Sequence, residues 1–259
     1  MARVSNDGVD LYYDTAGRGE TVAFVGDVGY GAWQWGWQHA AVAGPYRSLV
    51  TDLRGCGRSN APSGPYAVAD FVDDLTAVLS DAGVRSAHVV GAGLGGMVAL
   101  EAARTTSRVD SLVLVGTAAR GEGLDLEPLW GAPDDRGALE GSLRAGFSGS
   151  FSEARPDALA QMVDWRSAED AARSAWEAQI AAVTDFDVSD RLYAITDPAL
   201  VVHGADDAVW PFERGDALAE GLPRGELSSI EDAGHLVHIE ASKRVNDDLL
   251  GFLAALEDA

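Results

Sequence analysis

Short apolar runs alternate with amphipathic segments along most of the chain. Residues 8–17 alternate between polar and apolar positions and end in glycine, which predicts an early strand, and residues 225–230 predict a final one. Five runs between them are mostly apolar, as in strands that are buried on both faces of a parallel sheet: residues 20–26, 46–53, 86–91, 111–117 and 199–205.

Segments with helical periodicity separate these strands. Between residues 66 and 84, apolar side chains recur on one helical face, and Gly83 ends the segment. Similar segments occupy residues 32–44, 94–104, 212–222 and 241–257. Repeated alternation of strand and helix predicts an α/β fold, with a mostly parallel sheet of about eight strands and helices on both faces.

One long stretch, residues 119–197, lacks strand-like runs. It begins with Gly, Pro and acidic residues and continues through three helix-like segments, near residues 137–147, 155–165 and 168–183. A structureless loop of this length is uncommon in a compact domain, so we expect a helical cap inserted after the sixth strand. The predicted domains are a core of residues 1–118 and 198–259 and a cap of residues 119–197.

Acidic residues dominate the charge balance. The chain has 41 Asp and Glu against 19 Lys and Arg, for a net charge of −22, and Lys243 is its single lysine. A field of this sign repels nucleic acids and anionic membranes, so we expect neither as a partner. The composition resembles that of halophilic proteins, whose self-repulsion is screened by molar salt. An ordinary acidic protein from a GC-rich genome is the alternative.

The sequence shows neither a targeting segment nor a metal-binding cluster. No apolar region follows Met1, and no apolar run approaches about 18 residues, so we expect a cytoplasmic protein. Cys56 is the single cysteine, which excludes an intrachain disulfide and a cysteine-rich metal site. We expect no metal, no cofactor, a small-molecule substrate, and a monomer or homodimer.

Four short motifs occur at the ends of predicted elements. They are "DLRGCGRS" at residues 52–59, "GAGLGG" at residues 91–96, "HGADDAVWP" at residues 203–211, and "DAGHLVHIE" at residues 232–240, before the last helix. In this order, they resemble the α/β-hydrolase fold superfamily, of the single-domain type with a helical cap. The resemblance covers nearly the whole chain and implies an active site at the carboxyl ends of the strands.

The resemblance selects an acid and a base. In G-x-x-D-x-x-x-P, the acid lies three residues after the glycine, which gives Asp207 counted from Gly204, with Asp206 as the alternative. The base follows a glycine in the loop after the last strand, which gives His235. A carboxylate bound to one imidazole nitrogen sets the tautomer and leaves the other nitrogen as a base directed at the pocket.

Two departures from the family pattern fall in this same site. The pattern G-x-S-x-G has a serine nucleophile, but Gly93 stands there, so the catalytic triad is degenerate and no acyl-enzyme can form at this vacant position. The oxyanion segment, normally His-Gly-x, contains Asp27 beside Val28. The backbone N–H groups of Val28 and Leu94 can still form the oxyanion hole. Asp27 is interpreted either as a second acid or base, or as a turn cap that faces water.

Two functions are compatible with these residues. The first is an enzyme that acts on a small, mostly apolar ester, lactone or carbonyl compound, with His235 and Asp207 as general base on water or substrate. Relatives of the fold extend this to lyase, isomerase and cofactor-free oxygenase reactions. The second is a catalytically inactive, ligand-binding pseudoenzyme. In both, three tryptophans near the pocket rim are candidate substrate contacts: Trp33, Trp35 and Trp210.

Overall fold

One mixed sheet organises the molecule, and a computed structural model describes residues 2–257 of it. The strand order is β1-β2-β4-β3-β5-β6-β7-β8; β1, β2 and β4 pair antiparallel, and all pairs from β4 to β8 are parallel. The strands are β1 (Ala2–Asn6), β2 (Val9–Gly17), β3 (Thr21–Val25), β4 (Arg47–Thr51), β5 (Ala87–Ala92), β6 (Val109–Val115), β7 (Ala199–Gly204) and β8 (Gly225–Ile230). The predicted sheet of about eight strands is confirmed, and β1 is the strand for which no range was predicted.

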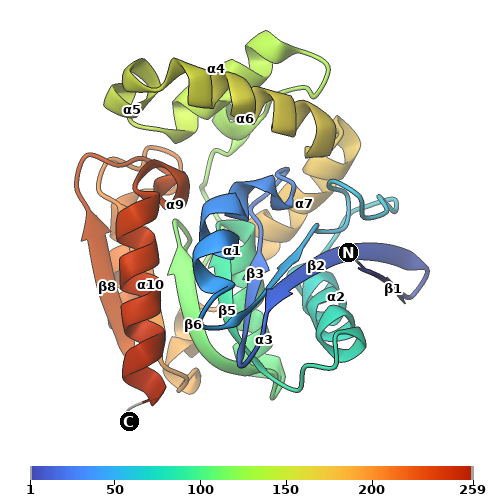
Figure 1. Ribbon diagram of the computed structural model, residues 1–259, viewed down its shortest axis with the longest axis vertical. Coiled ribbons are helices and arrows are strands. Elements are labelled where there is room, and N and C mark those ends of the chain that lie inside the picture. The colour runs from blue at the N-terminus through green and yellow to red at the C-terminus, as the bar shows by residue number, and fades with distance from the viewer. Residues whose placement is uncertain (1, 258–259) are drawn as a thin grey trace.

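Helices cover both faces of this sheet (Figure 1). In β3, Val22 and Phe24 pack into one apolar cluster with α1 and α10, whereas Ala23 and Val25 pack into another with α2 and α3. Burial on both sides explains why the central strands are mostly apolar. The helices outside residues 119–197 are η1 (Ala32–Trp35), α1 (Gly36–Val42), α2 (Val68–Asp81), α3 (Leu94–Thr105), α8 (Phe212–Gly221), α9 (Val237–Glu240) and α10 (Ser242–Glu257).

Local chemistry accounts for the bounds of α2. At its start, the Asp70 carboxylate accepts a hydrogen bond from the Ala67 backbone N–H, at 2.8 Å, which satisfies a donor that the helix leaves unpaired. At its end, Gly83 adopts φ +69°, a left-handed conformation that favours glycine. Within residues 2–257, no helix is long and apolar enough to cross a membrane.

The segment between β6 and β7, residues 119–197, is helical, and we call it the inserted segment. It contains η2 (Glu127–Leu129), α4 (Arg136–Gly146), α5 (Gly149–Ala154), α6 (Pro156–Glu169), α7 (Arg173–Asp185) and η3 (Ser189–Ala194). In Figure 1, α4, α5 and α6 lie above the sheet. The three expected helices correspond to α4, α6 and α7, whereas α5 was not expected. The division into core and cap domains stays a prediction.

A buried ion pair helps to attach the inserted segment to the core. Arg166 Nε lies 2.6 Å from Asp170 Oδ2, and the two side chains are only 2% and 3% exposed. Asp170 also accepts a hydrogen bond from Trp33 Nε1, at 2.9 Å, and the Arg166 guanidinium lies over the Tyr30 ring, at 4.5 Å. The remaining Arg166 donors bind oxygens of the inserted segment itself. We call the side chains of Arg166, Asp170, Trp33 and Tyr30 the Arg166 network.

Candidate active site

Four strand ends bring the residues of the site together. Asp27 lies two residues after β3, Gly93 directly follows β5, Asp207 follows β7, and His235 lies in the loop after β8. Parallel strands present their carboxyl ends at one edge of the sheet, so residues distant in sequence converge there. Gly116, which follows β6 at φ +49°, makes room for the histidine, because a Cβ at this position would lie 3.2 Å from His235 Nδ1.

Asp207 holds His235 as the sequence predicts. His235 Nδ1 lies 2.9 Å from Asp207 Oδ2. The other oxygen, Oδ1, accepts hydrogen bonds from the backbone N–H groups of Val209 and Trp210, at 2.9 and 2.8 Å. Burial opposes ionisation, but the positive charge of His235 and its hydrogen bond outweigh burial and hold the pKa of Asp207 below its usual value. The alternative acid, Asp206, is exposed.

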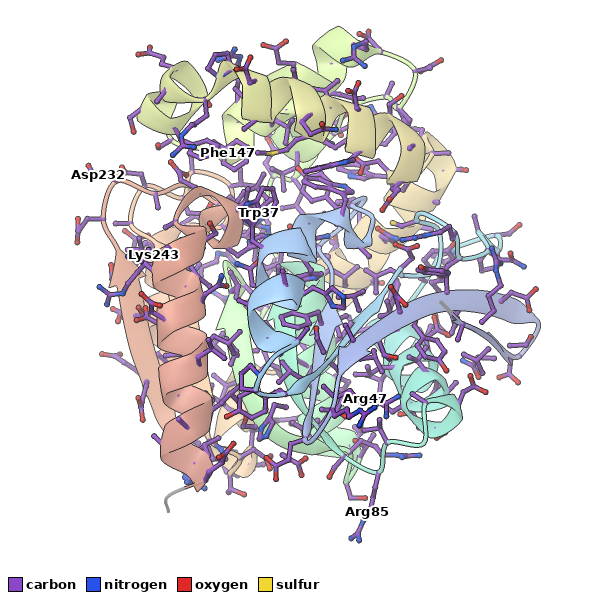
Figure 2. The ribbon with its side chains drawn as sticks, viewed as in Figure 1. Trp37, Arg47, Arg85, Phe147, Asp232 and Lys243 are labelled. Atoms are coloured by element: carbon purple, nitrogen blue, oxygen red, sulfur yellow. The ribbon has the colours of Figure 1, made fainter. Side chains whose placement is uncertain are left out.

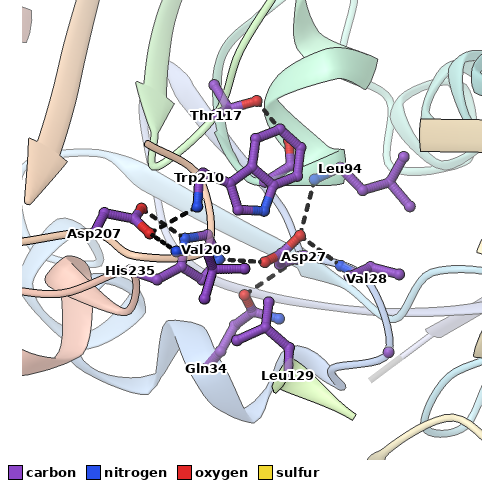
Figure 3. A network of polar contacts seen from close by, with 12 residues as sticks. Asp27, Val28, Gln34, Leu94, Thr117, Leu129, Asp207, Val209, Trp210 and His235 are labelled. Carbon is purple, nitrogen blue, oxygen red and sulfur yellow. Dashed lines mark hydrogen bonds and ion pairs between the residues drawn. The ribbon is translucent and has the colours of Figure 1, made fainter. Parts of the chain in front are cut away.

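Asp27 occupies the opposite side of the imidazole. Its Oδ2 lies 2.7 Å from His235 Nε2. Its Oδ1 accepts hydrogen bonds from the backbone N–H groups of Val28 and Leu94, at 2.7 and 2.9 Å, so both expected oxyanion-hole donors point at one oxygen (Figure 3). That oxygen belongs to the protein itself. The Asp27 side chain is fully buried, so the interpretation as a cap that faces water is wrong.

Gly93 and Asp27 depend on each other sterically. A Cβ built on Gly93 would lie 1.8 Å from Asp27 Oδ1, far inside any van der Waals contact. Gly93 also adopts φ +47° and ψ −113°, a conformation that strains residues with a side chain. The expectation of a vacant nucleophile position is therefore wrong, because the Asp27 carboxylate fills that space.

The two carboxylates determine the charge state of His235. Burial alone would lower its pKa, but the charge of Asp207 and the hydrogen bonds to Asp207 and Asp27 outweigh it and raise the pKa to about 10. The ring is therefore an imidazolium at neutral pH, and both of its nitrogens are bound to carboxylate oxygens. Neither nitrogen is free to take a proton from water, as the general-base hypothesis requires.

Comparison with known proteins places this geometry in a family. A model described as "Alpha/beta hydrolase family" matches residues 24–248. The chain belongs to the alpha/beta hydrolase family. Its relatives in this family include proteins named putative carbamate hydrolase RutD, from Azorhizobium caulinodans (29% identical, covering 96% of each chain) and from Variovorax paradoxus (30% identical, covering 94% of this chain and 96% of the relative).

Solved structures agree with this membership. Est816, described as an N-acyl homoserine lactone degrading enzyme, is 30% identical, with a TM-score of 0.83 over 97% of this chain and 100% of that one. The enol-lactonase from Burkholderia xenovorans LB400 is 24% identical, with a TM-score of 0.87 over 98% of this chain and 100% of that one, and shows the shared fold alone. Similarity to both extends over nearly the whole chain.

The three tryptophans expected at a pocket rim have different places in this family fold, and all are buried. Trp210 lies in the site, where its ring is nearly parallel to that of the site histidine, with centroids 6.1 Å apart. Trp33 belongs to the Arg166 network. Trp35 packs in the apolar cluster on the other side of the sheet, against Phe24 and His238. The structure therefore brings only Trp210 to the site.

Sequence reasoning missed the residues that support the two carboxylates. His203 Nε2 lies 3.3 Å from Asp207 Oδ2 and 2.7 Å from the Trp210 carbonyl oxygen. Gln34 Oε1 accepts a hydrogen bond from the Asp27 backbone N–H, at 3.2 Å. His203 lies in the predicted strand 199–205 and begins the motif "HGADDAVWP", which assigns it no role, and Gln34 lies in a predicted helix outside the four motifs. The one available signal was the place of His203 four residues before the acid.

The inserted segment is hydrogen-bonded to loops on two sides of the site. From α7, Gln179 Oε1 accepts a hydrogen bond from the Gly29 backbone N–H, at 2.6 Å, and the Gly29 carbonyl oxygen accepts one from Ala171, at 2.8 Å. Beside His235, the Leu236 backbone N–H donates to the Gly146 carbonyl oxygen, at 2.8 Å. Phe147 and Trp37, labelled in Figure 2, lie at this border. The inserted segment is therefore bound to the chain on both sides of the site, in which Asp27 is fully buried.

Proposed function

We propose that this protein is a hydrolase of small molecules in which Asp27 is the nucleophile, at the place where the family pattern has serine. One observation carries the proposal: the Asp27 carboxylate lies between the oxyanion-hole donors and His235, in the space left by Gly93. A carboxylate in this position has what a covalent nucleophile needs, namely a free electron pair, an adjacent imidazole and a third group that orients it.

The reaction has two steps. In the first, Asp27 Oδ2 attacks the substrate, the leaving group departs, and an Asp27 ester forms. In the second, water attacks Cγ of Asp27, and the negative charge develops on Oδ1, which already accepts hydrogen bonds from Val28 and Leu94. Cleavage of the bond between Cγ and Oδ2 then releases the product, which carries the Oδ2 oxygen, and the oxygen from water restores the carboxylate.

His235 changes its role between these steps. Esterification removes the negative charge of Asp27, which lowers the pKa of His235. The imidazole can then lose its Nε2 proton and act as the base that activates water, held in place by Asp207. The general-base role expected for His235 and Asp207 thus applies to the second step.

The surroundings support a small, mostly apolar substrate. Val28 and Leu94 belong to an apolar cluster that also contains Trp210 and, from the inserted segment, Leu129 and Phe147. The names of relatives, a putative carbamate hydrolase and a lactone degrading enzyme, support hydrolysis of small molecules. A carbonyl substrate remains compatible only if Oδ1 leaves the oxyanion hole.

A second candidate is the inactive, ligand-binding protein. The observation in its favour is that the ionised groups of the site are buried and bind one another, as in a purely structural network. In that case, the carboxylate of Asp27 would stabilise the fold in place of a serine.

Incorporation of oxygen from water into Asp27 separates the two candidates. The protein is incubated in H₂¹⁸O with short esters, lactones, alkyl halides and epoxides, and the peptide that contains Asp27 is then analysed by mass spectrometry. We expect ¹⁸O in the Asp27 carboxylate after turnover, and none without substrate. The variant His235→Gln should instead accumulate the ester on Asp27.

Two results would contradict the nucleophile. Turnover that leaves Asp27 unlabelled assigns the chemistry to another group. Ligands that raise the melting temperature without turnover, label or adduct favour the binding protein. The matched control is Asp206→Asn, which removes an exposed carboxylate beside the acid and should leave labelling unchanged.

A further inference from the structure

The occupied oxyanion hole limits which substrates this site can attack. Attack on a carbonyl carbon moves negative charge onto the carbonyl oxygen of the substrate, and that oxygen needs the donors of the hole. Here the N–H groups of Val28 and Leu94 both donate to Oδ1 of the nucleophile itself, at 2.7 and 2.9 Å. A substrate carbonyl oxygen would therefore have to displace Asp27, and displacement would move Oδ2 away from His235.

Attack on a saturated carbon has no such conflict. In a displacement reaction, negative charge passes from the carboxylate to the leaving group, and no charged oxygen forms on the reacting carbon. We propose that the substrate carries its leaving group on a saturated carbon, as in an alkyl halide or an epoxide. The inference rests on the proposed role of Asp27 as nucleophile and specifies the substrate class of that same site.

The bonds and protons balance over the two steps. Asp27 Oδ2 forms a bond to carbon as the bond from carbon to the leaving group breaks, which gives the ester and the free leaving group. Water then replaces the alkyl oxygen at Cγ, and the product is an alcohol. For a halide, the sum is R–X + H₂O → R–OH + H⁺ + X⁻. For an epoxide, the opened ring oxygen takes up a proton, the attacking water restores that proton to the site, and the product is a diol.

Trp210 provides a donor for the leaving group. Its Nε1 is buried and has no hydrogen-bond partner within the described residues. The indole is nearly parallel to the His235 ring, and in Figure 3 its nitrogen edge is turned toward Asp27. A buried N–H without an acceptor is unfavourable, and an anionic or partly charged leaving group would satisfy it.

The experiment compares four probes of equal carbon number: a primary bromoalkane, a terminal epoxide, an ester and a lactone. We expect turnover of the bromoalkane or the epoxide, with ¹⁸O from water in Asp27. In His235→Gln, we expect Asp27 to gain the mass of the alkyl group. Trp210→Phe should lower kcat/KM for the alkyl probe by about 10- to 100-fold, the effect of losing a hydrogen bond to a charged group.

Trp35→Phe is the matched control. It removes another buried indole N–H without a partner, but on the opposite side of the sheet, so kcat/KM should stay unchanged. Label in Asp27 from the ester or lactone alone would overturn the substrate class and leave the nucleophile intact. Turnover without label would contradict the nucleophile. Absence of any adduct on Asp27 from both alkyl probes overturns the inference.

Discussion

The Arg166 network and the candidate active site both contain buried charges, and they differ in what surrounds those charges. In the Arg166 network, the guanidinium binds Asp170, a serine hydroxyl and carbonyl oxygens of the inserted segment. In the site, the Asp27 carboxylate binds the backbone N–H groups of Val28 and Leu94 and one edge of His235. Both groups are nearly inaccessible to solvent.

The difference shows why buried charge alone does not identify an active site. Arg166 and Asp170 both belong to the inserted segment and neutralise each other, and their contacts to Tyr30 and Trp33 of the core stabilise one packing. In the site, one imidazolium lies between two carboxylates, so negative charge is in excess, and the donors of a strand-to-helix turn point at the oxygen that would carry charge during a reaction. Three changes test this contrast.

The largest effect is expected when the nucleophile is moved from position 27 to position 93. Asp27→Gly combined with Gly93→Ser clears the oxyanion hole and puts a hydroxyl at the turn, beside an imidazole that then has one free nitrogen. We expect hydrolysis of a short chromogenic ester at least about 10³-fold above that of Asp27→Gly alone, with a burst of acyl-enzyme. Gly93→Ser alone should gain nothing, because its Cβ meets Asp27; equal activity of single and double variants would show that Asp27 does not block the position.

The next effect concerns the Arg166 network. Arg166→Met leaves the Asp170 carboxylate buried without its cation, and we expect the free energy of unfolding to fall by about 3 to 5 kcal/mol. Urea unfolding measures this loss, and adding Asp170→Asn should recover part of it. The exposed pair of Arg144 and Glu140 is the control, because removing Arg144 should cost less than about 1 kcal/mol. A loss for Arg166→Met as small as for the control would contradict a stabilising role.

The smallest effect is a dependence of stability on pH, which only the site should show. His235 has a raised pKa of about 10 in the folded protein against 6.5 for the free group, so its contribution is complete below about pH 6.5 and is lost as the pH rises through 10. We expect the free energy of unfolding to fall by roughly 2 kcal/mol between pH 7 and 9. Urea unfolding of His235→Gln should lack this component; parallel profiles of the two proteins would contradict the raised pKa.

Much of this arrangement could be predicted from the sequence because it follows from spacing. Apolar runs predicted the parallel strands, and the resemblance to the family pattern, applied to Gly204 and Gly234, selected Asp207 and His235. The donors of Val28 and Leu94 could be predicted because backbone N–H groups need no particular side chain. The halophilic adaptation stays a prediction, since it concerns solvent conditions rather than contacts.

The role of Asp27 could not be decided in the same way. Its position after a strand is compatible with a side chain that faces water or one that turns inward, and only the packing of β3 against β5 selects the second. One signal was present, because the departure at residue 27 accompanies the departure at residue 93. The two departures are linked by a steric contact between residues 27 and 93. These residues are 66 positions apart in the chain, so a local sequence pattern does not show that they meet.

The steric exclusion between residues 27 and 93 also restricts the order in which this site can have arisen. A serine at position 93 and an aspartate at position 27 cannot coexist in this geometry, since the side chain of one takes the space of the other. A path of single substitutions from a serine-containing ancestor that avoids this clash therefore passes through a chain with glycine at position 93 and a small residue at position 27. Such an intermediate has no nucleophile at all, and it survives only if the organism can spare the activity or keeps a second copy of the gene.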